Sequence, residues 1–354
     1  MNGPVIDFHA HIGVPAVDAL VSSQPAFFEH VQRENAVMGE QSVQQFLTLL
    51  PELTRALTDL EHRLSQMDER GVDVQVLSVN PVQYHYWADP ELSVEIARAV
   101  NSHIATVCAA HPTRFVGLGT VPLQHPDIAV GILREAVNVN GLEGVQISTS
   151  AQGRELADPV YGSFWAAAAD LGAIVFIHPW GCSLGTRLTA HYLTNIVGQP
   201  LETTIALSHL IFGGVLNRHP RLKIVAAHGG GYLPAYPGRS DHGYRVRPES
   251  RTAQYPPRHY LRQIYVDSLV YDDRCVRQLL ETIGEEHLLL GTDYPFDMGV
   301  SDISAGLGQL TDSQRAAVLG GNAAALLGLS DQATKKGNDD GTTHGHAADD
   351  SSAS

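Results

Sequence analysis

Two histidines separated by one residue begin the set of side chains that could bind a metal. The segment VIDFHAH (residues 5–11) alternates apolar and polar residues, so a strand would place Asp7, His9 and His11 on one face. Buried imidazoles are costly unless they bind something, and paired imidazoles are suitable ligands for a divalent ion. The spacing alone is weak evidence, because a chain with 18 histidines contains about one such pair by chance.

Three further polar residues stand where apolar runs end. His178, His228 and Asp293 each close a run that is typical of a buried strand. Active sites of parallel barrels lie at the carboxyl ends of strands, so these residues and the first pair predict one metal site. Gly291 should leave room beside Asp293, and the glycines at 229–231 should let the backbone approach a ligand closely.

The elements that must position these residues are short strands alternating with helical segments. Eight apolar or β-branched runs predict strands, at residues 5–12, 72–79, 115–121, 144–148, 173–178, 223–228, 263–269 and 287–293. Most are separated by segments rich in Ala, Leu, Glu, Gln and Arg, which favour parallel strands joined by helices. We therefore predict an α/β fold, a (β/α)8 TIM-type barrel, with an open doubly wound sheet as the alternative.

The spacing of the strands predicts an insertion near the start of the chain. About 60 residues separate the first two strands, where a barrel unit averages roughly 30. We expect residues 13–50 to form a cap-like insertion at the mouth of the barrel, and residues 53–70 to form the first barrel helix. Residues 1–330 would then be one barrel domain.

Residues 331–354 differ from the rest of the chain in composition. They are almost devoid of apolar residues, so we expect a disordered tail. The sequence does not assign a role to His344 and His346 within it. The chain as a whole has 23 Lys+Arg and 38 Asp+Glu, and its net charge of −15 argues against nucleic acid and anionic membrane surfaces as partners.

Membrane insertion and export are also not expected. No apolar run approaches the roughly 18 residues of a membrane span, and the N-terminus lacks the pattern of a signal peptide. Cys108, Cys182 and Cys275 form no CxxC pair and fit reduced thiols. We expect a cytoplasmic protein.

Five motifs together resemble one known family. They are QMDERGVDVQV (66–76), HPW (178–180), HGGG (228–231), VDS (266–268) and GTDYPF (291–296). In order and spacing, over residues 5–329, they resemble the amidohydrolase superfamily. Within it they are similar to the metal-dependent decarboxylases typified by 2-amino-3-carboxymuconate-6-semialdehyde decarboxylase.

The resemblance implies roles for the polar residues. His9, His11, His178 and Asp293 would bind the metal, and His228 would be the acid/base group, with His228 and Asp293 forming the catalytic pair. Members with two metals carry a Lys or Glu bridge on the fourth strand, where this chain reads GVQIST (144–149). We therefore expect one divalent ion, Zn²⁺ first and Mn²⁺ as the alternative.

Substrate contacts are implied in the same way. Arg239 and Arg247 would hold the carboxylate of a small substrate, Arg247 reaching in from the second subunit of a homodimer, whereas a solvated basic loop is the alternative. Trp180 and Phe296 would flank an unsaturated substrate. Weaker candidates for substrate contacts at the mouth of the barrel are Asn80, His85 and Tyr86. The alternative interpretation is that these side chains only pack within their loop.

The sequence departs from the family in the substrate region. A further Arg is expected after the first strand, but Pro51 stands there with Arg55 nearby, and His191 replaces an expected aromatic residue. These changes leave the metal set intact. We predict a lyase, a non-oxidative carboxy-lyase acting on a small unsaturated or aromatic carboxylic acid. A metal-dependent amidohydrolase or lactonase of the same fold, with hydrolase activity, is the second hypothesis, and a non-catalytic binding protein is the third.

Overall fold

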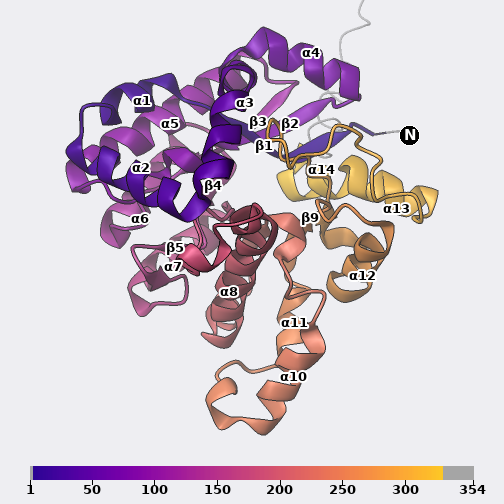
Figure 1. The fold of residues 1–354 in the computed structure, drawn as a ribbon. Coiled ribbons are helices and arrows are strands. Elements are labelled where there is room, and N and C mark those ends of the chain that lie inside the picture. Colours follow the sequence, from indigo (N-terminus) through magenta and orange to yellow (C-terminus); the bar gives the residue numbers. More distant parts are fainter. Residues whose placement is uncertain (1–2, 330–354) are drawn as a thin grey trace, which may run out of the picture.

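The computed structural model describes residues 3–329, and Figure 1 shows their fold. The expected tail at 331–354, with His344 and His346, lies outside the described residues. The proposed domain limit at residue 330 therefore stays a prediction.

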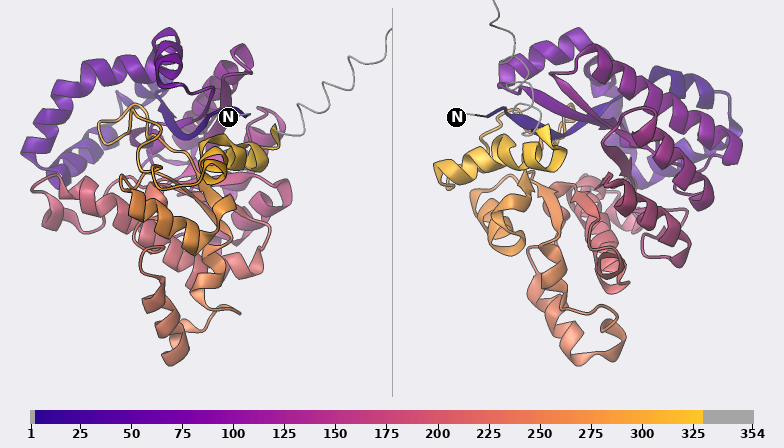
Figure 2. Two further views of the ribbon diagram at one scale, coloured as in Figure 1. Left: turned by 90° about the vertical axis from the view of Figure 1, so that its right-hand side faces the viewer. Right: turned by 180° about the vertical axis from the view of Figure 1, so that it is seen from behind.

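Eight parallel strands form the centre of the molecule (Figures 1 and 2). They are β1 (Ile6–Ile12), β2 (Val74–Val79), β3 (Phe115–Thr120), β4 (Gly144–Ile147), β7 (Ile174–Ile177), β8 (Lys223–Ala226), β9 (Ile264–Asp267) and β10 (Leu288–Leu289), paired in this order. The sheet closes on itself, because the Phe8 N–H donates to the Leu290 carbonyl at 2.8 Å and the Asp293 N–H donates to the His9 carbonyl at 2.8 Å. The predicted barrel and its eight strands are confirmed.

Helices surround the strands. They are α4 (Leu60–Arg70), α5 (Pro90–Ala110), α6 (Pro126–Asn138), α7 (Gly162–Leu171), α8 (Gln199–Phe212), α9 (Val215–Arg218), α10 (Pro237–Val246), α11 (Pro257–Leu261), α12 (Asp273–Ile283), α13 (Asp312–Ala316) and α14 (Asn322–Leu327). A short hairpin, β5 (Ser150–Ala151) with β6 (Arg154–Glu155), follows β4. None of the described helices has both the length and the apolar character that crossing a membrane requires.

α12 shows why these segments become helices. The Asp272 carboxylate caps the first turn by accepting the N–H of Arg274 at 2.8 Å. The buried residues Val276, Leu279 and Ile283 recur at helical spacing and face the barrel. Capping and periodicity therefore specify this helix locally.

The segment before α4 is helical. It contains α1 (Pro15–Val21), α2 (Pro25–Met38) and α3 (Glu40–Thr58). The expected helix at 53–70 is divided, because Asp59 has extended backbone and its carboxylate caps α4 through the N–H of His62 at 3.0 Å. Residues 53–58 therefore belong to α3, which extends the inserted segment beyond its predicted end at residue 50.

β1 carries a β-bulge that the sequence pattern does not indicate. Its register passes from Asp7 opposite Gln75 to Ala10 opposite Leu77, so Phe8 and His9 together stand opposite one residue of β2. The expectation that Asp7 shares a face with His9 and His11 is wrong. The bulge turns His9 to the inner face, where His11 also lies, and leaves Asp7 on the outer face.

Candidate metal centre and active site

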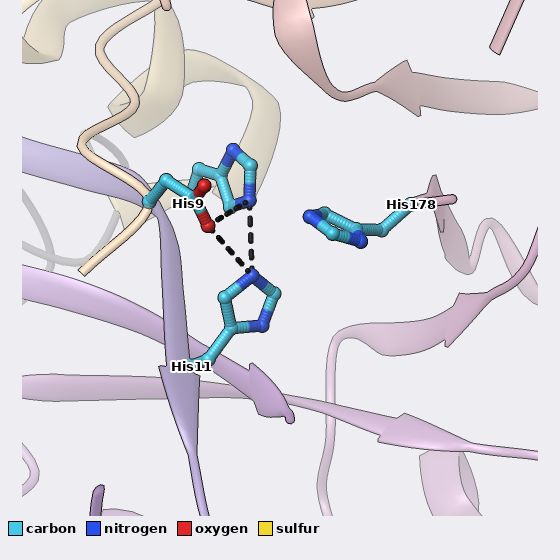
Figure 3. A group of neighbouring side chains, drawn as sticks. His9, His11 and His178 are labelled. Atoms are coloured by element: carbon cyan, nitrogen blue, oxygen red, sulfur yellow. Dashed lines mark hydrogen bonds and ion pairs between the residues drawn. The ribbon is translucent and has the colours of Figure 1, made fainter. Parts of the chain in front are cut away.

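Four buried side chains meet at the carboxyl ends of the strands. His9 and His11 come from β1, His178 follows β7, and Asp293 follows β10; one ligand atom from each lies within 4.8 Å of the others. The Nε2 atoms of His9 and His11 are 3.0 Å apart, and each is 3.2 Å from Asp293 Oδ1. Figure 3 shows the His178 ring turned toward the other two imidazoles. The structure thus brings together the four predicted ligands.

The imidazole nitrogens and the carboxylate oxygen that face the centre of this cluster fit a divalent metal. Within residues 3–329, His178 Nε2 is buried without a hydrogen-bond partner, and buried Asp293 Oδ1 has no hydrogen bond besides its 3.2 Å approaches to the Nε2 atoms of His9 and His11. The Nδ1 atoms are engaged elsewhere: His11 Nδ1 is 3.2 Å from the Val79 carbonyl and His178 Nδ1 is 2.9 Å from the Pro179 carbonyl. These contacts direct each Nε2 toward the centre of the cluster, as in metal sites with three imidazoles and one carboxylate.

Asp267 organises the site from behind. It is fully buried at the end of β9, and its Oδ2 lies 2.7 Å from His9 Nδ1 and accepts the N–H of His228 at 2.9 Å. Its Oδ1 accepts the N–H of Gly229 at 2.9 Å. Asp267 belongs to the VDS motif, but its role is not predicted from the sequence, where its only signals are that motif and its place near the end of the predicted strand at 263–269.

Charge and burial oppose each other within the cluster. Burial lowers the pKa of His9, but Asp293 and Asp267 outweigh that effect and raise it to about 10. Burial lowers the pKa of His11 to about 4 and that of His178 well below its ordinary value. Burial raises the pKa of Asp293, but the neighbouring histidines, His9 foremost, hold it well below the ordinary range. The carboxylate therefore stays charged, as a metal ligand must.

His228 lies beside the ligand cluster. Its Nε2 is 3.9 Å from Asp293 Oδ2, and its ring centroid is 5.1 Å from that of His178. Its Nδ1 is buried without a partner among the described residues, and the ring borders the pocket. Its left-handed backbone, with φ of 55°, is held by the bond from its N–H to Asp267. The structure brings His228 to the place predicted for an acid/base group.

Glycines near the site have two different functions. A Cβ at Gly291 would lie 2.6 Å from the Cβ of Asp267 and 2.9 Å from that of His9, so this glycine makes room for the site as expected. A Cβ at Gly229 would lie 2.4 Å from Val270, and at Gly231 2.2 Å from the Pro200 carbonyl. The close approach expected of residues 229–231 is therefore to the protein and not to a ligand.

A pocket of about 1000 Å³ opens onto the cluster. Its wall includes His178, His228 and Asp293 together with side chains of α2 and α3 and of the turn after β2. Trp180 and Phe296 line it as predicted, and the Phe296 ring centroid is 5.4 Å from that of His11. His85 and His191 also line it. The arrangement is a set of side chains that fits a divalent metal, at the base of a mainly apolar pocket that suits a small unsaturated molecule.

The comparisons with known proteins agree with this site. The model of the family described as Amidohydrolase matches residues 6–329. The chain belongs to the amidohydrolase family. It is also 38% identical over 276 residues to 2-amino-3-carboxymuconate-6-semialdehyde decarboxylase of Dictyostelium discoideum, covering 77% of each chain.

Solved structures of this family have the same fold. The 5-carboxyvanillate decarboxylase of Sphingomonas paucimobilis is 25% identical, with a TM-score of 0.79 over 92% of this chain and 98% of that chain. A dihydroxybenzoic acid decarboxylase of Polaromonas sp. JS666, with bound manganese and an inhibitor, is 24% identical, with a TM-score of 0.78 over 93% and 98%. The prediction of a metal-dependent carboxy-lyase is confirmed by these relatives, which are decarboxylases, and the hydrolase alternative is not supported.

The basic residues expected to bind the substrate lie outside the pocket of this family member. Arg239 is exposed on α10, and Arg247, which follows α10, pairs with Glu249 at 2.6 Å. Figures 1 and 2 show α10 projecting away from the barrel. Arg55 lies 3.8 Å from Asp59 on the outer surface. Of the described residues that line the pocket, none is Lys or Arg.

The three weaker candidates for substrate contacts differ in their location. Asn80 accepts the N–H of Val82 at 3.2 Å and so caps the turn after β2. The Tyr86 hydroxyl accepts the N–H of Ser148 at 3.2 Å. For these two the loop-packing interpretation fits the contacts, whereas His85 lies on the pocket wall.

Proposed function

We propose that His9, His11, His178 and Asp293 hold one divalent metal, Zn²⁺ first, and that the chain uses it to decarboxylate a small unsaturated or aromatic acid without an oxidant. The observation that carries this proposal is the convergence of four buried ligand atoms within 4.8 Å at the base of the pocket. The set suits Zn²⁺, whereas the manganese in the Polaromonas enzyme keeps Mn²⁺ as the alternative.

In the proposed mechanism, the metal and His228 have different roles. When bound, the metal supplies Lewis-acid chemistry that polarises oxygen atoms of water and substrate. His228, whose Nδ1 is unpaired among residues 3–329, takes up a proton and returns it to the carbon from which CO₂ leaves. Asp267 fixes the backbone of His228, and Asp293 lies close enough to stabilise its charged form.

The pocket walls orient the substrate. Trp180 and Phe296 present aromatic faces on which a planar conjugated acid would pack. This contact aligns the carboxylate so that the electrons of the broken carbon–carboxylate bond enter the conjugated system as CO₂ leaves. His228 can then protonate the carbon that carried the carboxylate. Exclusion of water by the apolar wall strengthens each of these electrostatic contacts.

We propose that the active form is a homodimer in which the partner completes the pocket. The pocket of one chain is lined by no described Lys or Arg, while α10 and its neighbourhood carry exposed Arg239 and Arg247 away from the barrel. Guanidinium groups bind carboxylates in bidentate fashion, so this projecting segment is suited to reach the pocket of a second subunit. Since the three cysteines are free, we also propose a reducing, cytoplasmic setting.

The direct test is release of CO₂. Metal-replete protein is incubated with carboxylated muconate semialdehydes and hydroxybenzoates, and CO₂ is measured as it forms. Release from at least one acid, lost in His228→Ala, is the expected result. Cleavage of lactones or amides without CO₂ from any acid would contradict the proposal.

A further inference from the structure

His85 is a buried polar residue on the pocket wall that the mechanism does not use. It follows the turn Pro81–Tyr84 after β2 and is only 4% exposed. Neither of its ring nitrogens has a hydrogen-bond partner anywhere in the part of the chain that the structure describes. More than about nine in ten buried polar groups have a hydrogen-bond partner. The ring nitrogens of His85 are therefore available to form hydrogen bonds with a bound molecule.

The turn holds His85 in a fixed position relative to the metal ligands. Its φ of 45° is a left-handed conformation that a non-glycine residue adopts at a cost. The preceding Tyr84 donates its hydroxyl to the His178 carbonyl at 3.1 Å and stacks on Tyr86 at 5.3 Å. The His85 carbonyl accepts the N–H of Ala88 at 2.9 Å. The position of the imidazole is therefore tied to the strand that carries a metal ligand.

The surroundings of the ring define what it can bind. Phe27 and Trp87 lie against it, with ring centroids at 5.8 Å and 5.5 Å. Burial foremost, and then His30, lower the pKa of His85 to about 4, so the ring is neutral at pH 7. A neutral imidazole has one donor and one acceptor nitrogen. It complements a hydroxyl or carbonyl oxygen and offers no charge to a second carboxylate.

We propose that His85 is a specificity-determining residue that hydrogen-bonds a neutral hydroxyl or carbonyl oxygen of the substrate, remote from the carboxylate at the metal. This inference rests on the proposed decarboxylase function. It adds the reason why one substituted acid would be preferred over another. A site built to pair with a substrate oxygen rejects the analogue without it, because its own polar group then stays unpaired.

The test measures binding to the metal-loaded protein. Affinities are determined calorimetrically for benzoate and for the 2-, 3- and 4-hydroxybenzoates with wild-type protein, His85→Phe and His85→Gln. Wild-type protein should bind at least one hydroxybenzoate about 10-fold more tightly than benzoate. His85→Phe should remove that preference, and His85→Gln, which keeps a neutral donor and acceptor, should retain part of it.

A matched control and an independent variant make the result decisive. His103→Phe changes a half-buried histidine of α5 outside the pocket and should keep the wild-type affinities. Should His85→Phe not fold, His85→Ala removes the ring without adding bulk. Equal wild-type affinities for all four acids, or a preference that survives loss of the imidazole, would overturn the inference. A preference that depends on His85 without CO₂ release from any acid would instead reject the proposed function alone.

Discussion

At the scale of single residues, the histidines that we propose as metal ligands and the proposed acid/base group differ in what surrounds their nitrogens. His9, His11 and His178 each have Nδ1 directed at a protein oxygen, which leaves Nε2 for the metal. Among residues 3–329, His228 Nδ1 has no hydrogen-bond partner and its Nε2 lies 3.9 Å from Asp293 Oδ2, so its ring keeps a free site for proton transfer. Replacing a proposed ligand histidine should therefore lower the metal content, whereas replacing His228 should lower turnover.

The metal content of two variants separates these roles. Wild-type protein should hold about one metal per chain by elemental analysis, and His178→Ala should lose most of it. His228→Ala should keep the metal while turnover falls on the order of 10² to 10⁴, the usual size of acid/base effects. Two metals per wild-type chain would refute a mononuclear site, and metal loss in His228→Ala would make that residue a ligand.

The burial of His85 should also influence stability as pH changes. Its pKa is about 4 in the folded chain against 6.5 ordinarily, so the unfolded chain binds a proton first as the pH falls. Folding stability is therefore lost between about pH 6.5 and pH 4, by at most about 1.4 kcal/mol per pH unit from this group. In His85→Phe the free energy of unfolding, measured in urea at pH 7, 6 and 5, should fall less steeply than in wild type. Equal slopes in both proteins would contradict the neutral, unpaired imidazole.

At the scale of elements, one buried arginine joins the inserted helices to the metal-bearing strand. Arg63 of α4 is fully buried and donates to the carbonyls of His11 and Ala56 and, at 3.1 Å, to Gln75 Oε1. Its guanidinium also lies 4.7 Å from the centre of the Tyr294 ring, next to Asp293 in the chain. Arg63 therefore fixes the end of α3, the start of α4 and the last residues of β1 relative to one another.

Loss of this connection should be costly. Arg63→Met leaves three buried acceptors without a donor, so the free energy of unfolding in urea should fall by about 2–4 kcal/mol. Arg55→Met is the matched control, because the side chain of Arg55 is exposed and its pair with Asp59 at 3.8 Å is screened by solvent, so this pair should contribute little to stability. Similar losses in both variants would show that the network around Arg63 has no special importance.

The elements also show what could be predicted from the sequence and what could not. The strands, and the ligands at their ends, follow from local patterns: apolar runs that close on His178 and Asp293. The β-bulge at Phe8 and His9 arises from pairing with β2, so alternation within β1 alone led to the wrong face for Asp7. The division between α3 and α4 depends on the extended backbone at Asp59, which a continuous helical pattern conceals.

Residues that act through distant partners were also beyond the sequence. Arg63 looks like any charged residue on an amphipathic helix until its acceptors on β1, α3 and β2 are known. Asp267 receives bonds from His9 and His228, which lie far from it in the chain. Such roles depend on tertiary contacts between residues that are far apart in the chain, and local sequence patterns do not indicate those contacts.

At the scale of the whole molecule, the charged groups that a carboxylate needs are separated from the pocket that needs them. The metal site lies at the base of a pocket with no described Lys or Arg, while α10 carries arginines at the far end of a projecting segment. In the homodimer that we propose, arginines of the partner subunit would complete the pocket. Arg247→Ala should then reduce kcat/KM roughly 10- to 100-fold with unchanged metal content, the effect of one charge-assisted hydrogen bond.

Subunit mixing tests whether that arginine acts across the dimer. A hybrid of inactive His228→Ala and impaired Arg247→Ala chains contains one pocket with an intact His228 and with the partner subunit's Arg247. Mixed chains, exchanged under mild denaturant and assayed for CO₂, should therefore regain activity that neither parent shows, up to about half of the wild-type activity per hybrid dimer. A mixture of His228→Ala with a second variant of its own pocket, His178→Ala, provides the comparison, because the partner subunit supplies neither of these two histidines. Their hybrid has one defect in each pocket and should stay inactive. If exchange is demonstrated by mass spectrometry and only background activity returns with Arg247→Ala, or if the wild-type protein is fully active as a monomer, the arginine does not cross the interface and the segment at 237–247 is a solvated surface.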